Sequence, residues 1–317
     1  MKLIKGNIYL SENSEKSVTL EDNTVDYNYQ KFYITYLNDS FKKAKGGNSS
    51  VFKIYNSEDS TEEYVIKISR IYKPQRNANE SVVKKYSRFI EEVAALKAFS
   101  EFGTTNIVQY LDDGFVEIDG KQFPYYIMEK ADTDLKEYMF DNREIDIQEK
   151  VKFCYHIYLA ISQLHQQGYY HRDIKPDNIL LFYDDSDKTS VNWKIGDLGL
   201  IKRRDKDYDD IGEKVGPFGW LSPEACNKFL TEKANIGFDC SIDESSDVFQ
   251  LGKLFWFIFQ GNIPVGQLTK EDFISEFKND GIIYSIIEEM LRYSKSKRIK
   301  METLGEILED VKLDFAV

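Results

Sequence analysis

The chain has 317 residues, of which 42% are hydrophobic and 30% charged, and its formal net charge is −12. These values describe a globular protein long enough to bury a core, and the negative charge argues against nucleic acid as the main partner. No apolar run could span a membrane, Met1–Leu10 lacks a secretory signal pattern, and the three cysteines follow no metal or disulfide spacing. We therefore expect a cytoplasmic protein with reduced thiols that binds neither a membrane nor nucleic acid.

The first 40 residues alternate weakly between apolar and polar residues, with polar turn residues between the segments. This pattern predicts a short β-hairpin near the start of the chain and a strand near Phe32–Leu37. We interpret residues 1–40 as an N-terminal extension of the domain that follows.

Small residues and turn formers make up the segment from Ala44 to Val51, which reads A-K-G-G-N-S-S-V. Taken alone, this segment is about as consistent with an ordinary turn as with a phosphate-binding loop. The next pattern, Tyr64–Ile68, alternates as a strand in which Val65 and Lys67 point to the same face. A lone strand lysine is more often an exposed edge charge, so a role for Lys67 depends on the other motifs.

Residues Arg88–Ser100 show the apolar periodicity of a helix. Glu92 flanks the apolar stripe of this helix, where burial of an unpaired carboxylate would be costly. Two strands are expected near Ile107–Tyr110 and Tyr125–Met128, with a turn between extended segments. A second amphipathic helix is expected over Gln148–Gln166, and it would pack beneath the loop that follows.

That loop, His171–Asn178, reads H-R-D-I-K-P-D-N. It brings a carboxylate (Asp173), an ammonium (Lys175) and a side-chain amide (Asn178) to one place. The carboxylate can accept a hydroxyl proton, the ammonium can meet negative charge that develops on a phosphate, and the amide can help to hold a metal. This combination predicts phosphoryl transfer.

Residues Trp193–Gly199 read W-K-I-G-D-L-G, and strand alternation would place Asp197 on the same face as Trp193 and Ile195. Two more motifs follow, G-P-F-G-W-L-S-P-E at 216–224 and D-V-F-Q-L-G at 247–252. Helical patterns complete the chain at Lys270–Lys278, Ile282–Arg292 and Met301–Leu308.

In this order the motifs resemble those of a eukaryotic-type protein kinase, and Lys175 resembles the lysine of the serine/threonine branch. The resemblance extends from about Phe41 to Val311. It implies an α+β, bilobal fold with a small antiparallel β lobe, which carries one helix (αC), and a large, mainly helical lobe. The implied domains are a small lobe at 41–128, a hinge at 129–132 and a large lobe at 133–317, with residues 1–40 as short strands packed on the small lobe.

The resemblance also implies a site for ATP. Lys67 would contact the α- and β-phosphates and pair with Glu92, with the adjacent Glu91 as the alternative partner. Asp134 would accept a hydrogen bond from a ribose hydroxyl, or cap the next helix, or do both. The implied ATP-binding residues are Ala44, Gly46, Gly47, Ser49, Val51, Val65, Lys67, Met128, Glu129, Ala131 and Asp134.

The implied reaction transfers the γ-phosphoryl group of ATP to a serine or threonine hydroxyl of a protein substrate. Asp173 would orient and deprotonate the hydroxyl, and Lys175 would stabilise the transferred group. Asp197 would bind the Mg²⁺ ion that bridges the phosphates, and Asn178 would ligate a second metal position. The acidic net charge is compatible with basic protein substrates, and the oligomeric state is left open.

The segment between Gly199 and the S-P-E motif contains no threonine, and its hydroxyls are those of Tyr208 and Ser222. The segment therefore has no threonine that could accept the usual activating phosphate. Arg172 nevertheless precedes Asp173, a feature of kinases in which the positive charge of this arginine must be neutralised. We predict that acidic residues replace the phosphate and that the enzyme is active as made. A phosphotyrosine at Tyr208 is the rival, and a solvated acidic loop is the plain alternative. The acidic candidates are Asp205, Asp207, Asp209 and Asp210.

The last motifs carry further expectations. Pro217 stands where serine/threonine kinases usually have a threonine that touches the catalytic aspartate and lysine. The resemblance implies a buried Glu224–Arg298 ion pair and an anchoring of the catalytic loop backbone by Asp247. An active serine/threonine protein kinase is favoured, and the alternative is a pseudokinase or scaffold. Two features suggest this alternative: Pro217, and a glycine loop that keeps only Gly46 of the family's glycines. A small-molecule kinase is third, because such enzymes generally lack the S-P-E and D-V-F-Q-L-G elements.

Overall fold

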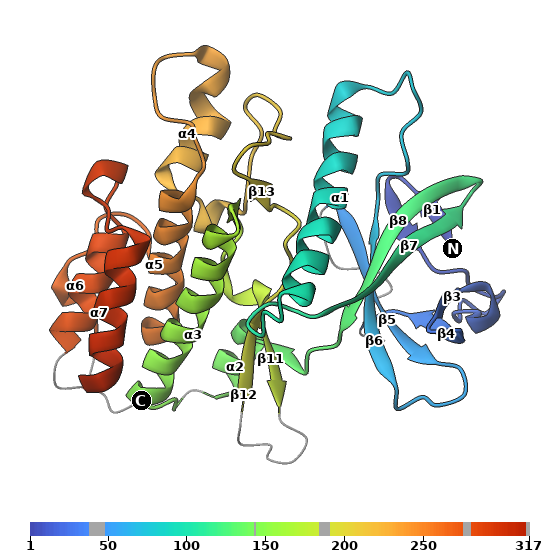
Figure 1. Cartoon of the computed structure of the whole chain (residues 1–317), viewed down its shortest axis with the longest axis horizontal. Coiled ribbons are helices and arrows are strands. Elements are labelled where there is room, and N and C mark those ends of the chain that lie inside the picture. Colours follow the sequence, from blue (N-terminus) through green and yellow to red (C-terminus); the bar gives the residue numbers. More distant parts are fainter. Residues whose placement is uncertain (38–47, 143, 184–190, 275–279, 315–317) are drawn as a thin grey trace. The chain divides into compact units, whose positions relative to one another are not determined.

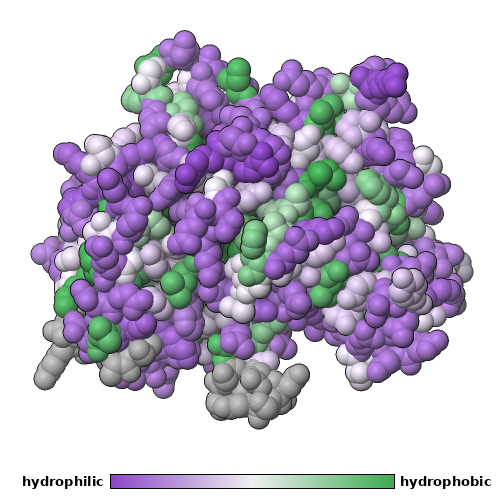
Figure 2. All heavy atoms as spheres, viewed as in Figure 1, coloured by the Kyte–Doolittle hydropathy of each residue, from purple (hydrophilic) through white to green (hydrophobic). Residues whose placement is uncertain are grey.

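The chain divides into two compact units, Met1–Lys130 and Ala131–Val317, of which the first is built mainly from strands and the second mainly from helices. The face of the molecule in Figure 2 is mainly hydrophilic, in keeping with the net charge of −12. In the part of the chain that is described, no helix is long and apolar enough to cross a lipid bilayer. The computed structural model (Figure 1) describes residues 1–37, 48–142, 144–183, 191–274 and 280–314.

The first unit is organised around one antiparallel sheet, which a separate hairpin precedes. The strands of the unit are β1 (Lys2–Ile4), β2 (Asn7–Tyr9), β3 (Thr24–Tyr27), β4 (Gln30–Thr35), β5 (Ser49–Asn56), β6 (Glu63–Ser69), β7 (Tyr110–Ile118) and β8 (Lys121–Glu129). Strands β1 and β2 form the hairpin, and the sheet has the order β3-β4-β5-β6-β8-β7. Alternating residues such as Phe52 and Ile54 of β5 and Ile66 and Ile68 of β6 lie in its core.

The predicted N-terminal hairpin and the strand near Phe32–Leu37 are both present, the latter as β4, which ends at Thr35. Strand β4 pairs with β5, so that Phe32 lies opposite Asn56. Ile8 and Leu10 are buried in the same core as the sheet. Much of the segment that the sequence marked as an extension is therefore integral to the sheet of the first unit.

Helix α1 (Glu80–Glu101) contains the predicted helix but begins at Glu80 rather than at Arg88. Asn79 caps it, since its side chain accepts a hydrogen bond from the backbone N–H of Ser81. The first turns of α1 are exposed or only partly buried, and they therefore lack the apolar periodicity that identified the rest of the helix.

The strand predicted near Ile107–Tyr110 is misplaced, because β7 begins at Tyr110. Ile107 and Val108 are buried in the approach to this strand rather than within it. The turn between β7 and β8 is at Asp119-Gly120, and both residues have positive φ (51° and 70°), as the tight hairpin turns rich in Asp-Gly require. β8 begins at Lys121 and thus extends beyond the predicted segment.

The second unit combines helices with short strands. Its helices are α2 (Leu135–Asp141), α3 (Ile147–Gln166), α4 (Pro223–Thr231), α5 (Glu244–Gln260), α6 (Asp280–Met290) and α7 (Met301–Asp314). Its strands are β9 (Thr133–Asp134), β10 (Tyr169–Tyr170), β11 (Ile179–Tyr183), β12 (Val191–Ile195) and β13 (Lys202–Arg203). Strands β12, β11 and β9 form one small sheet in that order, and β10 pairs with β13.

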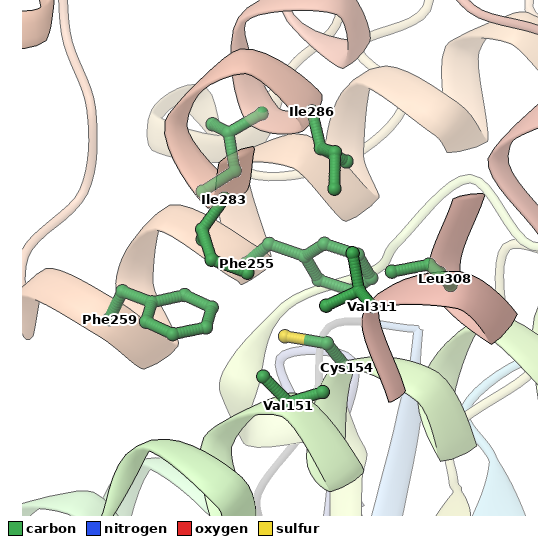
Figure 3. Close-up of a pocket in the computed structure, with 9 residues that line it drawn as sticks. Val151, Cys154, Phe255, Phe259, Ile283, Ile286, Leu308 and Val311 are labelled. Atoms are coloured by element: carbon green, nitrogen blue, oxygen red, sulfur yellow. The ribbon is translucent and has the colours of Figure 1, made fainter. Parts of the chain in front are cut away.

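The helical core of the second unit lies where α3, α5, α6 and α7 meet (Figure 3). Apolar side chains from these helices point toward one another and enclose a cavity of about 10 Å³, which is no larger than a single water. The Cys154 thiol faces this cavity, and burial raises its pKa well above the ordinary value, so the thiol is protonated and structural. The lining residues are Val151, Cys154, Phe255, Phe259, Ile283, Ile286, Ile287, Leu308 and Val311.

Three of the predicted helices in this unit correspond to α3, α6 and α7. The described part of the predicted helix Lys270–Lys278 forms a 3-10 turn at Lys270–Asp272, and residues 275–279 lie outside the described residues. The loop that follows β11, residues 184–190, also lies outside them.

Candidate active site

The loop His171–Asn178, the candidate catalytic loop, is anchored on helix α5 through a buried carboxylate. Asp247 accepts hydrogen bonds from the backbone N–H groups of His171 and Arg172, each at 2.7 Å, and lies 2.8 Å from Nε2 of His165. Burial alone would raise the pKa of Asp247, but hydrogen bonds from His165 and Arg172 and the nearby His171 lower it. The expected anchoring of the loop by Asp247 is present. His165 supports this carboxylate through its ring nitrogen Nε2.

Asp173 presents two chemically different oxygens. Its Oδ2 accepts from Nζ of Lys175 at 2.7 Å and from Nδ2 of Asn178 at 3.0 Å. Its Oδ1 is buried and has no hydrogen-bond partner among the described residues. Burial raises the pKa of Asp173 and the nearby Asp197 adds to this effect, while Lys175 opposes it. The arrangement leaves one oxygen able to accept a proton while the other is held in place.

His171 fixes the backbone of the loop rather than serving as a proton carrier. Its Nδ1 accepts from the backbone N–H of Asp173 at 3.2 Å. The ring is fully buried, and burial lowers its pKa, so the imidazole is neutral.

Asp197 lies just beyond β12 rather than on it. The predicted strand face shared by Trp193, Ile195 and Asp197 is wrong, because β12 ends at Ile195 and Asp197 has a φ of 46°. A hydrogen bond of 2.9 Å from the backbone N–H of Gly196 to the carbonyl of Asn178 ties this strand end to the catalytic loop. A Cβ on Gly196 would lie 2.5 Å from Cδ1 of Leu180, so a side chain at this position would require the Leu180 side chain to shift.

Asn178 and Asp197 together fit a magnesium site that includes phosphate. Mg²⁺ prefers oxygen ligands and needs only one or two from the protein when it also binds phosphates. Nδ2 of Asn178 is committed to Asp173, which leaves the amide oxygen of Asn178 as the ligand atom, and Asp197 supplies a carboxylate. Within the described ranges, no cluster of three or more His, Cys, Asp or Glu residues could hold a metal.

In the first unit, the predicted ion pair between Lys67 and Glu92 is present. Nζ of Lys67 lies 2.6 Å from Oε1 of Glu92, and the two side chains are only 4% and 1% exposed. Tyr126 donates to the same carboxylate oxygen at 2.9 Å. Glu91 is also buried, but Glu92 is the partner of Lys67. A buried pair with a further hydrogen bond holds the ammonium group in one position.

Tyr126 is a site residue that sequence reasoning missed. It lies opposite Lys67 in the pairing of β6 with β8, and its ring lies under the Lys67 ammonium at 5.7 Å. Tyr126 and Met128 alternate on β8, so this polar aromatic residue in a buried strand could have been placed on the Lys67 face from the sequence.

Four of the residues predicted to contact ATP lie together on one face of the sheet. Val51 pairs directly with Lys67, and Val65 pairs directly with Met128. Since Val65 and Lys67 are two residues apart on β6, all four share that face. Ser49 is buried on β5 and Glu129 ends β8.

The other predicted ATP-binding residues lie in the second unit or outside the described residues. Ala44, Gly46 and Gly47 lie outside the described residues. Asp134 caps helix α2, because its carboxylate accepts from the backbone N–H of Glu137 at 3.0 Å. The cap was one of the two predicted roles for Asp134 and does not exclude the other. Ala131 begins the second unit, just before this cap.

Arg172 is neutralised by one of the four acidic candidates. Its Nη1 lies 2.6 Å from Oδ2 of Asp209, and both side chains are almost fully buried. Its Nε donates to the carbonyl of Leu200 at 2.7 Å. Near the surface, Asp205 instead pairs with Arg203 at 2.6 Å, and Asp207 pairs with Lys202 at 3.2 Å.

The S-P-E motif is fixed as expected. Nη2 of Arg298 lies 2.9 Å from Oε1 of Glu224, and both side chains are buried. Arg298 also donates to the carbonyls of Arg292, Ser245 and Tyr293. The charge of this guanidinium is therefore paired and its donors are used, which is what burial of a charge requires.

Comparisons with known proteins agree with these features. The chain matches the family model for the protein kinase domain over residues 44–307. It is 27% identical to the sensor for unfolded proteins in the ER ire1 of Schizosaccharomyces pombe, over 63% of this chain and 21% of that protein. It is 26% identical to the serine/threonine-protein kinase cds1 of the same organism, over 80% of this chain and 54% of that protein. It is 24% identical to the dual specificity protein kinase TTK of Mus musculus, over 71% of this chain and 24% of that protein. The matches thus span 54% or less of the length of these relatives.

Proposed function

We propose, because the chain belongs to the protein kinase domain family, that it transfers the γ-phosphoryl group of ATP to serine and threonine hydroxyls of protein substrates. The observation that carries this proposal is the environment of Asp173. One oxygen of this buried carboxylate is held by Lys175 and Asn178, and the other has no partner among the described residues. A carboxylate held in this way suits a base that orients a hydroxyl and accepts its proton.

The remaining residues suit the roles that the resemblance implies. Lys67, held by Glu92, would bind phosphate oxygens of ATP. Lys175 would stabilise negative charge on the transferred group while Asp173 receives the proton. Bound Mg²⁺ would neutralise charge on the phosphates, with Asp197 and Asn178 as its protein ligands.

The preference for serine and threonine rests on Lys175, which stands two residues after Asp173 in the pattern H-R-D-I-K. One relative is named a serine/threonine-protein kinase and another a dual specificity kinase, so tyrosine is the competing acceptor. The acceptor is therefore part of the test.

We further propose that transfer requires no phosphate on the segment between Gly199 and Ser222. The support is the buried contact between Arg172 and Asp209, which neutralises the arginine with a carboxylate of the chain itself. A phosphotyrosine at Tyr208 remains the competing source of charge. The cytoplasm would be the place of action, as the sequence properties suggest.

The proposal is tested by phosphate transfer from γ-labelled ATP to a mixture of protein substrates, with Asp173→Asn as the matched control. We expect labelled phosphoserine and phosphothreonine with the wild-type protein and a loss of at least about 1,000-fold with the variant, since both base and orientation are removed. Label on tyrosine alone would contradict the acceptor assignment. A wild-type protein as inactive as the variant would favour the pseudokinase alternative, which Pro217 and the retention of Gly46 alone among the loop glycines suggest.

A further inference from the structure

Helix α5 contacts the catalytic loop with a second buried side chain besides Asp247. Gln250 lies one turn further along α5 and is only 2% exposed. In the motif D-V-F-Q-L-G at 247–252, the resemblance implies a role for Asp247 and none for Gln250. Gln250 is therefore a feature of this chain that the motif does not explain.

Gln250 binds the backbone on both sides of Asp173. Its Nε2 donates to the carbonyl of Arg172 at 3.1 Å, and its Oε1 accepts from the N–H of Ile174 at 3.0 Å. With Asp247 and the His171 ring, this gives every backbone N–H from His171 to Ile174 a side-chain partner. Because both ends of the amide are used, the backbone that carries the base is held from either side.

The backbone immediately before Asp173 needs such support. Arg172 has a φ of 68°, a left-handed conformation that is unfavourable for a residue with a side chain. Such conformations persist only where the surroundings fix them. The bond from Gln250 to the Arg172 carbonyl acts on this residue directly.

The segment between Gly199 and the S-P-E motif passes close to the same carbonyl at Gly216. A Cβ on Gly216 would lie 3.4 Å from the carbonyl oxygen of Arg172 and 3.8 Å from Nε2 of Gln250. The next residue is Pro217, which has neither a hydroxyl nor a backbone N–H to donate. Pro217 therefore cannot make the contact to Asp173 and Lys175 that the family's threonine would make. The loop is instead held from α5 by the side-chain amide of Gln250.

We propose that Gln250 is a positioning residue for Asp173. The Gln250 amide fixes the position of Asp173, a role that Pro217 cannot share because it has no hydroxyl. This inference rests on the proposed function, because it concerns the rate of phosphate transfer. Gln250 itself touches neither substrate nor reacting atoms and acts through the backbone of Arg172 and Ile174.

The test replaces Gln250 with methionine, which has a similar size but cannot make either bond. The control is Trp256→Phe, which changes a residue farther along α5. It removes a hydrogen bond of 2.8 Å from Nε1 of Trp256 to Oδ1 of Asn262. We expect Gln250→Met to lower kcat about 10- to 100-fold, as small misplacements of catalytic groups do, with KM for ATP within about twofold of wild type. The control should keep kcat within about twofold even where it lowers the thermal midpoint equally.

A kcat for Gln250→Met within about twofold of wild type would overturn the inference and leave Gln250 a structural residue. If Gln250→Met does not fold, Gln250→Glu takes its place, since it keeps the acceptor for Ile174 and loses the donor to Arg172 at neutral pH. Hydrogen exchange of the peptide around 171–178 separates this inference from the proposed function. Exchange there should be faster in the Gln250 variant than in Trp256→Phe, and unchanged exchange would contradict the inference even if the wild-type protein transferred no phosphate.

Discussion

Asp173 differs from the exposed carboxylates of the chain in its surroundings. It is 6% exposed, and its partners Lys175 and Asn178 occupy only one of its oxygens. The order of residues in H-R-D-I-K-P-D-N was enough to nominate all three. It could not reveal that Oδ1 is unpartnered among the described residues, because that depends on how the loop folds against α5.

We predict that Asp173 titrates above 3.8, the ordinary value of an aspartate, because burial penalises its charged form and Lys175 offsets this only in part. As the pH falls through this raised pKa, the carboxylate takes up a proton and transfer should slow. The control is Asp205, whose pKa is lowered by hydrogen bonds from Arg203. NMR titration of carboxyl-labelled aspartates, assigned with Asp173→Asn and Asp205→Asn, measures both. A value for Asp173 at or below that of Asp205 would contradict the prediction.

The choice among the acidic candidates was also beyond the sequence. Four aspartates are close together in the segment, and any of them could have met Arg172. Only the fold of the segment decides, and it brings Asp209 to the guanidinium while Asp205 and Asp207 pair with neighbouring basic residues.

Asp209→Asn should reduce the transfer rate at least about tenfold and destabilise the protein by about 3–5 kcal/mol, because it leaves the buried Arg172 without its counter-charge. Tyr208→Phe is the matched control and should keep the wild-type rate. Initial rates on protein treated with a phosphatase, with urea unfolding in parallel, measure both effects. Loss of the wild-type rate on phosphatase treatment, together with loss in Tyr208→Phe, would show that phosphotyrosine supplies the charge.

At the scale of elements, prediction succeeded where the pattern covers the whole element and failed at the ends of elements. Helix α3 and strand β6 lie where their patterns placed them. The start of α1 and the start of β7 were misjudged, because the first turns of α1 are largely exposed and the residues before β7 are apolar although they are not in a strand. Asp197 was assigned to a strand because alternation alone cannot show that β12 ends at Ile195.

Helix α5 is also sensitive to side-chain volume where it packs on α6. A Cβ on Gly252 would lie 2.8 Å from Cβ of Met290 and 3.1 Å from Cδ2 of Leu291. We expect Gly252→Ala to lower the free energy of unfolding by about 1–3 kcal/mol through overpacking. Gly281→Ala, where a Cβ meets nothing within 4 Å, should not destabilise the protein. Equal midpoints of urea unfolding for the two variants would contradict this account of α5–α6 packing.

At the scale of the whole molecule, the chain has two compact units, and the candidate residues are held separately in each. Lys67 and Glu92 are fixed inside the first unit, while the catalytic loop is fixed to α5 inside the second. The sequence predicted both sets from motif order, and the join between the units, after Lys130, falls in the segment expected to be a hinge. The strand near Phe32 was predicted and is β4, but β3 (Thr24–Tyr27) was not predicted, because a short strand with weak alternation gives little signal.

The second unit should depend strongly on Arg298. Arg298→Met leaves the buried Glu224 unpaired and should cost about 3–5 kcal/mol of unfolding free energy. Arg292→Met is the matched control, since the Arg292 side chain is 42% exposed and its ion pairs should contribute less than about 1 kcal/mol. Denaturant unfolding monitored in the second unit compares the two. Similar losses for both variants would show that the Glu224 pair is not a major support of this unit.

The most direct test of phosphoryl transfer compares binding and transfer on the same preparations of the wild-type protein and Asp173→Asn. Calorimetry with ATP and Mg²⁺ gives the affinity, and release of γ-label to protein gives the rate. We predict that both proteins bind ATP within about threefold of each other and that only the wild type transfers phosphate, since Asp173 acts on the acceptor hydroxyl. A wild-type protein that binds ATP yet transfers no more phosphate than the variant would contradict the assignment of Asp173 as a catalytic base.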